Sequence, residues 1–404
     1  MIATFYPSKA RGNISAPPSK SMAHRLLICA GLSRGESLVQ NVALSDDIIA
    51  TLECLRALGA NIEISGSDVH ISGADREMPM PVADLACRDS GSTLRFLIPV
   101  CLLSSRKTIL RGSEQLLTRP LGVYEDICRK QGLTFVKTDG SLTVQGPLSG
   151  GDFVVAADVS SQFISGLLFA LPLLDRESCI RLIPPIESRP YIDMTMQALR
   201  IFGVDVSWSA YDTLSIPGGQ FYRSACVRVE GDYSAAACFH ALNLLGGEVT
   251  VDGLDPNSIQ GDRSYDVFFE QLKQGAPVID ISDCPDLGPV LMTVAAACHG
   301  ATLIGTRRLR YKESDRVQAM QEELGKFGAD VETKENSVHV RACPLHAPDR
   351  LLYGHNDHRI VMALSVLASR FGGSISGAET VRKSLPDFFD LLRLLNIDVA
   401  TGRI

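Results

Sequence analysis

Apolar and polar positions along the chain repeat one motif six times: an amphipathic helix that ends in glycine or asparagine, followed by a short alternating strand. The first copy is Leu58-Gly59-Ala60-Asn61-Ile62. The later copies are Gln131-Gly132-Leu133-Thr134-Phe135, Phe202-Gly203-Val204-Asp205-Val206, Gln274-Gly275-Ala276-Pro277-Val278, Phe327-Gly328-Ala329-Asp330-Val331 and Leu395-Asn396-Ile397-Asp398-Val399. Glycine and asparagine tolerate the left-handed backbone that ends many helices. The copies follow one another at intervals of 73, 71, 72, 53 and 68 residues, which predicts an internal repeat.

A second series of apolar helices alternates with the first. Their expected first residues are Ser21, Ser92, Ser161, Ser234, Asp286 and Asp357. Strand-like runs occupy residues 62–64, 69–71, 108–110, 249–251 and 338–340. Each repeat therefore predicts a small α/β unit with one buried helix and one outer helix. Six such units in 404 residues predict two domains of three units each.

Composition narrows the class of protein. Apolar residues make up 45% of the chain and charged residues 21%, as in soluble globular proteins. The net charge of -7 argues against a general nucleic-acid binder. The 11 cysteines form no CxxC pair, which favours free thiols in a reducing compartment. Neither a signal-peptide pattern nor an apolar run of membrane-spanning length is seen, so we expect a cytoplasmic protein without membrane contact.

The stretch Pro17-Pro18-Ser19-Lys20-Ser21-Met22-Ala23-His24-Arg25 has the pattern of an anion site. The prolines end what precedes them, and Ser19 or Ser21 can cap a helix whose apolar stripe begins at Met22. A helix start offers free backbone N–H groups and partial positive charge, to which Lys20 and Arg25 add full charges. An ordinary capped helix with two solvated cations is the alternative interpretation.

Other predicted helix starts carry similar residues. Arg95 follows Gly91 and small hydroxyl residues, and Arg119 precedes Pro120, which we expect to be the first residue of a helix. Further hydroxyl and amide groups stand at Ser160, Ser161, Gln162 and Ser188. Ordinary helix capping is the alternative at each of these positions.

Carboxylates stand among cations in the last third of the chain. Asp286 begins the apolar helix 287–298, where it could equally be a simple N-cap. Lys312 and Arg316 flank Glu313 and, at i,i+4 spacing, would share a helical face, although a solvated charged helix is the alternative. His355 and His358 have no cysteine or third histidine at ligand spacing, so no metal site is predicted.

Together these positions predict a cleft lined by cations, with Asp286 and Glu313 among them. The cations are Lys20, Arg25, Arg95, Arg119, Lys312, Arg316, Arg359 and Lys383. Such a cleft should bind small, highly anionic ligands, and its carboxylates could transfer protons.

Motifs in family order give the chain a resemblance to the 5-enolpyruvylshikimate-3-phosphate synthases (3-phosphoshikimate 1-carboxyvinyltransferases). They are Pro18-Ser19-Lys20-Ser21 through Arg25, Ser160-Ser161-Gln162, Ser188-Arg189-Pro190-Tyr191, Glu230-Gly231-Asp232, Pro285-Asp286, Lys312-Glu313-Ser314-Asp315-Arg316, Asn356-Asp357-His358-Arg359 and Lys383-Ser384-Leu385-Pro386-Asp387. The likeness covers nearly the whole chain. Each motif is modest evidence alone, and the set is highly specific.

The resemblance implies an α/β fold, a two-domain inside-out α/β barrel of six βαβαββ repeats, three per domain. It places residues 1–18 with 229–404 on the phosphoenolpyruvate side and residues 19–228 on the shikimate-3-phosphate side, with hinges near 17–19 and 226–230. It implies transfer of the enolpyruvyl group of phosphoenolpyruvate to the 5-hydroxyl of shikimate 3-phosphate. It also implies that the protein is a monomer, needs no metal or organic cofactor, and is the target of glyphosate. Closure of the two domains would exclude water.

The family's functional residues carry over to matching positions. Those implied for shikimate 3-phosphate are Lys20, Ser21, Arg25, Ser160, Ser161, Gln162, Ser188, Asp286 and Lys312. Those implied for phosphoenolpyruvate are Lys20, Gly91, Arg119, Gln162, Arg316, Arg359 and Lys383. The resemblance makes Asp286 the acceptor of the 5-hydroxyl proton and makes Glu313, with Lys20, the donor to the methylene carbon.

The chain departs from the family pattern at several positions, and two other functions stay open. Asp89 stands where many members have Asn, and it could weaken anion binding unless Arg88 or Arg95 pairs with it. Arg308 also stands where relatives often have Asn. A UDP-N-acetylglucosamine enolpyruvyl transferase is one alternative, although Lys20-Ser21 and the Cys-free loop before Arg119 argue against it. A non-catalytic anion-binding repeat protein is the other, and it predicts binding without turnover.

Overall fold

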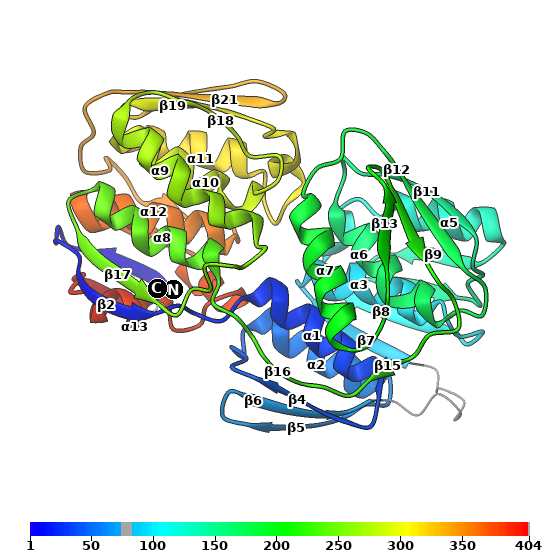
Figure 1. Ribbon diagram of the computed structural model, residues 1–404. Helices are drawn as coiled ribbons and strands as arrows, with labels where there is room; N and C mark the ends of the chain where they lie inside the picture. The colour runs from blue at the N-terminus through cyan, green and yellow to red at the C-terminus, as the bar shows by residue number, and fades with distance from the viewer. Residues whose placement is uncertain (74–82, 403–404) are drawn as a thin grey trace. The chain divides into compact units, whose positions relative to one another are not determined.

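The computed structural model describes residues 1–73 and 83–402. Its contacts divide the chain into two compact units, one of residues 1–17 with 231–404 and one of residues 18–230. The two units are described separately below, with element labels as in Figure 1.

Three four-stranded mixed sheets form the unit of residues 18–230, together with the short pair β15–β3. Its first repeat contains α1 (Lys20–Leu32), β3 (Ser33–Arg34), β4 (Glu36–Gln40), α2 (Asp46–Ala57), β5 (Asn61–Ser65) and β6 (Asp68–Ser72). The second contains β7 (Ala83–Arg88), α3 (Gly91–Cys101), β8 (Thr108–Gly112), α4 (Glu114–Thr118), α5 (Gly122–Gln131), β9 (Thr134–Thr138) and β10 (Ser141–Gln145). The third contains β11 (Asp152–Ala156), α6 (Ser161–Ala170), η1 (Leu171–Leu173), β12 (Ser178–Ile183), α7 (Arg189–Ile201), β13 (Ser207–Ala210) and β14 (Thr213–Ile216), followed by β15 (Tyr222–Arg223) and β16 (Cys226–Arg228).

The other unit holds the remaining three repeats. It begins with β1 (Ile2–Phe5) and β2 (Arg11–Ser15), and it resumes with α8 (Tyr233–Leu244), β17 (Glu248–Asp252), η2 (Gly261–Ser264) and α9 (Tyr265–Gln274). The fifth repeat contains β18 (Val278–Asp280), η3 (Pro285–Leu287), α10 (Gly288–Ala297), β19 (Gly300–Ile304), η4 (Arg307–Tyr311), α11 (Arg316–Gly325), β20 (Asp330–Thr333) and β21 (Ser337–Arg341). The sixth contains β22 (Leu352–Tyr353), α12 (His358–Phe371), β23 (Gly373–Ser376), η5 (Ala378–Lys383), α13 (Phe388–Leu394) and β24 (Val399–Gly402).

One pairing scheme is common to the four-stranded sheets. In the second repeat β7 runs parallel to β8, β8 is antiparallel to β10, and β10 is antiparallel to β9. The sheets β11-β12-β14-β13 and β18-β19-β21-β20 have the same order. This is the predicted βαβαββ repeat.

Two sheets are completed by strands from distant parts of the chain. β16 lies parallel to β4 and so gives the first repeat its leading strand from the far end of the same unit. β1 pairs with both β23 and β24 and so closes the sixth repeat from the N-terminus. Each unit is therefore held together by its first and last segments.

The fourth repeat is shorter than the others. Its sheet within the described residues consists of β2 and β17 in parallel, and β18 of the next repeat begins only four residues after Gln274. The hairpin that closes the other repeats has no counterpart here. Its loss accounts for the 53-residue interval between Gly275 and Gly328.

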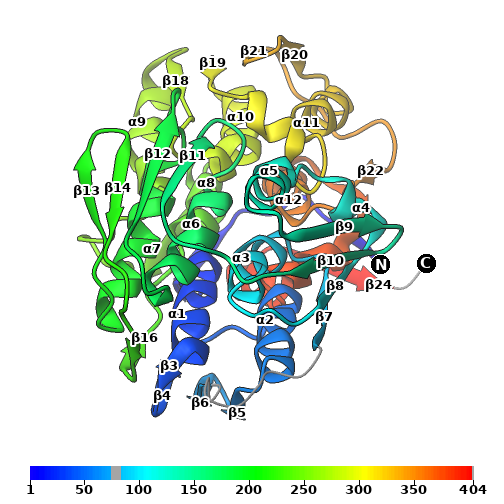
Figure 2. The same cartoon turned by 90° about the vertical axis from the view of Figure 1, so that its right-hand side faces the viewer.

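Apolar helices form the interior of each unit. Figures 1 and 2 show the course of these helices in two views. In one unit α8, α10 and α12 pack against one another. In the other α3 packs on α2 and α6. Residues of α10 and α12 are buried nearly throughout, and each unit has its own hydrophobic core. The six helix starts predicted from the sequence lie at or near the starts of α1, α3, α6, α8, α10 and α12, and most residues of these helices are buried.

The predicted left-handed helix ends are present in five of the six repeats. The backbone φ is positive at Gly59, Gly132, Gly203, Gly328 and Asn396. Gly275 is the exception, because its φ of 172° is extended. It is the residue at which the fourth repeat passes directly into the next one.

Candidate active site

The start of α1 carries the first group of predicted site residues. Ser19, rather than Ser21, is the N-cap, and its hydroxyl accepts a hydrogen bond from the Met22 amide. Lys20 is the first helical residue, and its Nζ donates to Asp47 Oδ2 at 2.8 Å. Asp47 is buried in the first turn of α2. The side chain of Lys20 is 14% exposed, so a buried carboxylate holds a cation that can still be reached by solvent.

Arg25 is buried one turn further along α1. Its guanidinium donates to the hydroxyl of Thr195 at 2.8 Å and to the backbone carbonyls of Ser21 and Tyr191 at 2.6 and 2.9 Å. It also lies 5.2 Å from the ring centroid of Phe96. Burial lowers the pKa of Arg25 to about 10. The solvated-cation interpretation of this stretch is therefore wrong for Arg25, which joins α1 to α7.

Gly91 and Arg119 meet at the start of α3. A side-chain carbon at Gly91 would lie 2.5 Å from the Arg119 guanidinium, so only glycine allows this approach. The helix after Arg119 begins at Gly122, not at Pro120 as predicted. Arg119 has the extended backbone that a following proline favours, and it ends the short helix α4.

Gln162 is held between two neighbours at the start of α6. Its Oε1 accepts from Arg95 at 2.9 Å, and its Nε2 donates to the Ser92 hydroxyl at 3.0 Å. Ser160 is the N-cap of α6 and accepts from the Gln162 amide. Ser161 is the buried first residue of that helix. Ser188, also buried, precedes α7 in a left-handed conformation with φ 55°.

The other unit places Asp286 among three cations. Its Oδ1 accepts from Lys312 Nζ at 3.2 Å and from Arg316 at 3.0 Å, and its Oδ2 lies 3.7 Å from Arg359. Asp286 lies in η3 and forms no cap hydrogen bond, so the N-cap alternative is wrong. Its carboxylate is 20% exposed. A charged oxygen therefore faces solvent beside a cation cluster.

Lys312 and Arg316 do not share one helix, contrary to the prediction. Lys312 follows η4, whereas Arg316 is the first residue of α11. Asp315 separates them because it is the N-cap of α11 and accepts from the Gln318 amide at 3.0 Å. The alternative of a solvated charged helix is also wrong, since Arg308 and Arg316 are buried.

Asp357 fixes two of these elements to each other. Its carboxylate accepts from Arg316 Nε at 2.8 Å and from a second guanidinium nitrogen at 3.2 Å. It also accepts from the Ser314 hydroxyl at 3.1 Å and caps α12 through the Arg359 amide at 2.9 Å. Asp357 is fully buried, so this bidentate ion pair is well shielded from water.

The cluster shifts the pKa values of its members. Burial opposes ionisation of Asp286, but Lys312, Arg316 and Arg359 outweigh it and hold the pKa of Asp286 well below its ordinary value. Burial lowers the pKa of Lys312 to about 8, and the charges of Arg316 and Arg308 act in the same direction against the attraction of Asp286. Burial likewise opposes the charge of Arg316, yet Asp357 and Asp286 raise its pKa. Asp286 is therefore ionised at neutral pH, whereas Lys312 loses its proton slightly above neutral pH.

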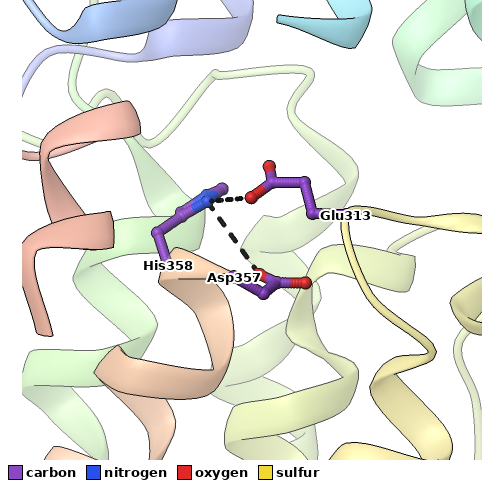
Figure 3. Close-up of side chains that lie close together, drawn as sticks. All are labelled: Glu313, Asp357 and His358. Carbon is purple, nitrogen blue, oxygen red and sulfur yellow. Dashed lines mark hydrogen bonds and ion pairs between the residues drawn. The ribbon is translucent and has the colours of Figure 1, made fainter. Parts of the chain in front are cut away.

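Glu313 and His358 form a second pair in this region (Figure 3). The ring Nδ1 of His358 lies 3.0 Å from Glu313 Oε2 and 4.0 Å from Asp357 Oδ1. Glu313 is 16% exposed, whereas His358 is 3% exposed. A partly exposed carboxyl group backed by a buried imidazole has the composition of a proton-transfer site.

Among the described residues, two groups of carboxylates with a histidine come close enough to be considered as metal ligands. One is Glu313, Asp357 and His358, and the other is Glu322, Glu323 and His355. Lys326 Nζ donates to both oxygens of Glu323, and Arg316 occupies both oxygens of Asp357. Cations of the protein itself therefore neutralise the central carboxylate of each group.

Lys383 completes the set. It is nearly buried in η5, and its Nζ donates to the backbone carbonyl of Asn356 at 2.9 Å and to the side-chain oxygen of the same residue at 3.0 Å. The predicted cations thus fall into two groups, Lys20, Arg25, Arg95 and Arg119 in one unit and Lys312, Arg316, Arg359 and Lys383 in the other. The single cleft expected from the sequence stays a prediction.

Some residues that contact the predicted site were not predicted as functional, and three of them are charged or titratable. They are Asp47, which holds Lys20, Asp357, which holds Arg316, and His358, which contacts Glu313. Asp357 could have been found as the cap of a predicted helix. Asp47 pairs with Lys20 across 27 residues, and no local sequence pattern signals such a pairing. Of the two positions named as departures from the family pattern, one is Asp89, and its neighbour Arg88 donates to Glu53 at 2.7 and 2.8 Å. The other is Arg308, which is buried beside Lys312.

Solved structures identify the fold. The EPSP synthase of Acinetobacter baumannii matches with a TM-score of 0.80 over 99% of this chain and 100% of that one, at 24% identity. The enolpyruvyl transferase NikO of Streptomyces tendae also has a TM-score of 0.80, over 99% and 98% of the two chains, at 14% identity. The chain thus has the enolpyruvyl transferase fold, as predicted.

Sequence comparison then gives the family. The profile of EPSP synthase (3-phosphoshikimate 1-carboxyvinyltransferase) matches residues 6–392. The 3-phosphoshikimate 1-carboxyvinyltransferase of Clostridium kluyveri is 40% identical, with 97% of each chain covered. That of a Clostridium perfringens strain is 38% identical, covering 96% of this chain and 97% of the relative. The chain belongs to the EPSP synthase family, which confirms the predicted resemblance. Within the described residues, no helix combines the length and apolar character needed to span a bilayer.

Proposed function

We propose that the two groups of charged side chains bind phosphoenolpyruvate and 3-phosphoshikimate and transfer the 1-carboxyvinyl group of the first to the 5-hydroxyl of the second. Phosphate is the other product, and the reaction belongs to aromatic amino acid (chorismate) biosynthesis. Membership of the family supports the reaction. The observation that carries the site assignment is Asp286, an ionised carboxylate facing three cations.

The family motifs suggest one substrate side for each unit, and the proposed ligands of each substrate include residues of both units. The unit of residues 18–230 is proposed as the 3-phosphoshikimate side, and residues 1–17 with 231–404 as the phosphoenolpyruvate side. The proposed ligands of 3-phosphoshikimate are Lys20, Ser21, Arg25, Ser160, Ser161, Gln162, Ser188, Asp286 and Lys312. Those of phosphoenolpyruvate are Lys20, Gly91, Arg119, Gln162, Arg316, Arg359 and Lys383. The hydrogen bonds that hold Lys20 and Gln162 in place support their role as fixed donors.

Asp286 is the proposed base for the 5-hydroxyl proton. Its three cations keep the pKa of Asp286 well below the ordinary value, which makes it a weak base. Anionic groups of the substrates would share Lys312, Arg316 and Arg359 with it. Because a neighbouring anion disfavours ionisation of a carboxylate, the pKa of Asp286 would rise as the site fills. Basicity is then greatest when the hydroxyl to be deprotonated is present.

Glu313 is the proposed acid, acting with Lys20. It would donate a proton to the methylene carbon of phosphoenolpyruvate while the 5-oxygen attacks the neighbouring carbon, which gives a tetrahedral adduct. Loss of phosphate from the adduct and return of one methyl proton to the ionised Glu313 would then form the enol ether. The cations around the phosphate and carboxylate groups would stabilise the charge that develops. Contact with His358 supports a role for Glu313 in proton transfer, because the ring can share the proton.

Asp286→Asn tests this assignment, with Asp283→Asn as the matched control. Asp283 is an exposed aspartate three residues away. We expect Asp286→Asn to lower kcat by about 10²- to 10⁴-fold, as loss of a general base does, while 3-phosphoshikimate still binds. The enol ether product is measured by NMR. Turnover of Asp286→Asn at the rate of the wild type would show that another group takes the proton.

We further propose a cytoplasmic monomer that needs no metal or organic cofactor. The eleven free cysteines support a reducing compartment. Sedimentation equilibrium tests the oligomeric state, and full activity after treatment with a chelator tests the absence of a metal requirement.

A further inference from the structure

The turn that joins β22 to α12 has a left-handed backbone at two consecutive positions. His355 and Asn356, two consecutive residues with side chains, have φ values of 50° and 52°. Residues with side chains adopt this left-handed region less readily than glycine, although asparagine and histidine tolerate it better than most. The amide of Asp357 donates to the Gly354 carbonyl at 2.9 Å and closes the turn. Other contacts within the unit give the turn further support.

Buried Glu323 provides that support. Its fully buried carboxylate accepts from Lys326 Nζ at 2.7 and 2.9 Å, from the Tyr353 amide at 2.8 Å and from His355 Nε2 at 3.0 Å. A carboxylate only accepts, so His355 carries a proton on Nε2. Burial opposes ionisation of Glu323, but the hydrogen bonds from His355 and Lys326 lower its pKa. An ionised, fully bonded group thus fixes the backbone before the turn and the side chain within it.

Helix α11 holds this turn at two points. Arg316 begins the helix and binds Asp357, and Glu323 lies seven residues later and binds His355. Residues seven apart lie on nearly the same face of a helix, two turns from each other. One helix face therefore contacts both His355 and Asp357, on the two sides of Asn356.

We infer that Glu323 and His355 are positioning residues that hold this turn and, through it, the phosphoenolpyruvate-binding cations. Asn356 in the turn accepts two hydrogen bonds from Lys383 through its backbone and side-chain oxygens. Asp357 aligns Arg316 and caps the helix turn that carries Arg359. A change at His355 thus reaches these cations without contact with substrate. The inference rests on the proposed assignment of Arg316, Arg359 and Lys383 to phosphoenolpyruvate.

Substitutions of His355 test the inference by steady-state kinetics. We expect His355→Ala to raise the KM for phosphoenolpyruvate about tenfold, since small displacements of binding groups cost this much or more, and to leave the KM for 3-phosphoshikimate within about twofold. His355→Gln keeps an N–H donor for Glu323 and should restore most of the wild-type value. His339→Ala is the matched control, because it removes one histidine hydrogen bond, to Thr302, from the same unit. It should change neither KM.

Two results would overturn the inference. One is a His355→Ala enzyme with a lower Tm and unchanged kinetic constants, because His355 would then only stabilise the fold. The other is an equal rise of both KM values, which would indicate general distortion. Calorimetric titration with phosphoenolpyruvate keeps the test independent of turnover. If the wild type binds phosphoenolpyruvate but releases no phosphate with 3-phosphoshikimate, the proposed reaction fails. A selective loss of that binding in His355→Ala would still support the positioning role.

Discussion

The pKa of Lys312 gives the most specific prediction about binding. Burial lowers this pKa to about 8, so most Lys312 side chains are charged at pH 7 and few are at pH 9. Lys312 is a proposed ligand of 3-phosphoshikimate, whose phosphate, with a second pKa of about 6, is fully charged throughout this range. Asp286 stays ionised as well, because its pKa is far below the range. The charge of Lys312 is therefore the variable that binding should report.

The magnitude follows from the titration. One pH unit above a pKa of about 8, roughly a tenth of the lysine is protonated, so the Kd of 3-phosphoshikimate should rise about tenfold between pH 7 and pH 9, or about 1.4 kcal/mol. Isothermal titration calorimetry at constant ionic strength measures this directly. Lys312→Arg is the control, because arginine stays charged and should bind with little dependence on pH.

Stability should change with pH in the opposite direction. In the unfolded chain Lys312 titrates near its ordinary value of 10.5, above its folded pKa of about 8. Between these values the unfolded state binds more protons, so the contribution of Lys312 to the free energy of unfolding rises with pH.

Two results of the binding experiment would refute the assignment of Lys312 to 3-phosphoshikimate. One is a Kd that stays constant from pH 7 to 9.5, and the other is the same increase of Kd in Lys312→Arg.

Further predictions concern the proton donor and the contact between Gly91 and Arg119. Glu313→Gln should lower kcat about 10²- to 10⁴-fold and change substrate affinity little, because it removes a proton carrier and keeps the shape of the side chain. Measuring both kcat and Kd checks this. Lost affinity with normal turnover at saturation would refute the role of Glu313. Gly91→Ala should raise the KM for phosphoenolpyruvate about tenfold, since the new carbon would lie 2.5 Å from the Arg119 guanidinium. The control Gly122→Ala adds a carbon with nothing within 4 Å and should change neither KM. Arg119→Ala should weaken phosphoenolpyruvate binding more than 3-phosphoshikimate binding, and equal weakening in calorimetry would contradict its role.

Local signals made much of the fold predictable from the sequence. Serine and aspartate caps mark where core helices begin, as at Ser19 and Asp357, and left-handed glycines mark where outer helices end. These signals depend on neighbouring residues alone. The sequence showed a short interval before Gly328. Only the strand pairing in the structure explains this interval as a missing hairpin in the fourth repeat. β1 and β16 complete sheets whose other strands lie far away in the sequence, so no local pattern indicates these strand pairings.

For the candidate site, the sequence predicted the charged residues but not their partners. Residue types at helix starts indicated the cations, whereas their partners are set by tertiary contacts. Asp286 could be a cap or a charged acceptor, and only the approach of Lys312 and Arg316 decides between them. The prediction of a shared helix for those two cations failed because Asp315 starts a new helix. The role of Glu323 could not be predicted, since its partner His355 lies 32 residues away.

Phosphate release from phosphoenolpyruvate tests the central claim most directly. The account predicts rapid release when 3-phosphoshikimate is present and none when it is omitted or replaced by UDP-N-acetylglucosamine. Release that requires UDP-N-acetylglucosamine instead, or binding of both anions without any release, would contradict the proposed reaction.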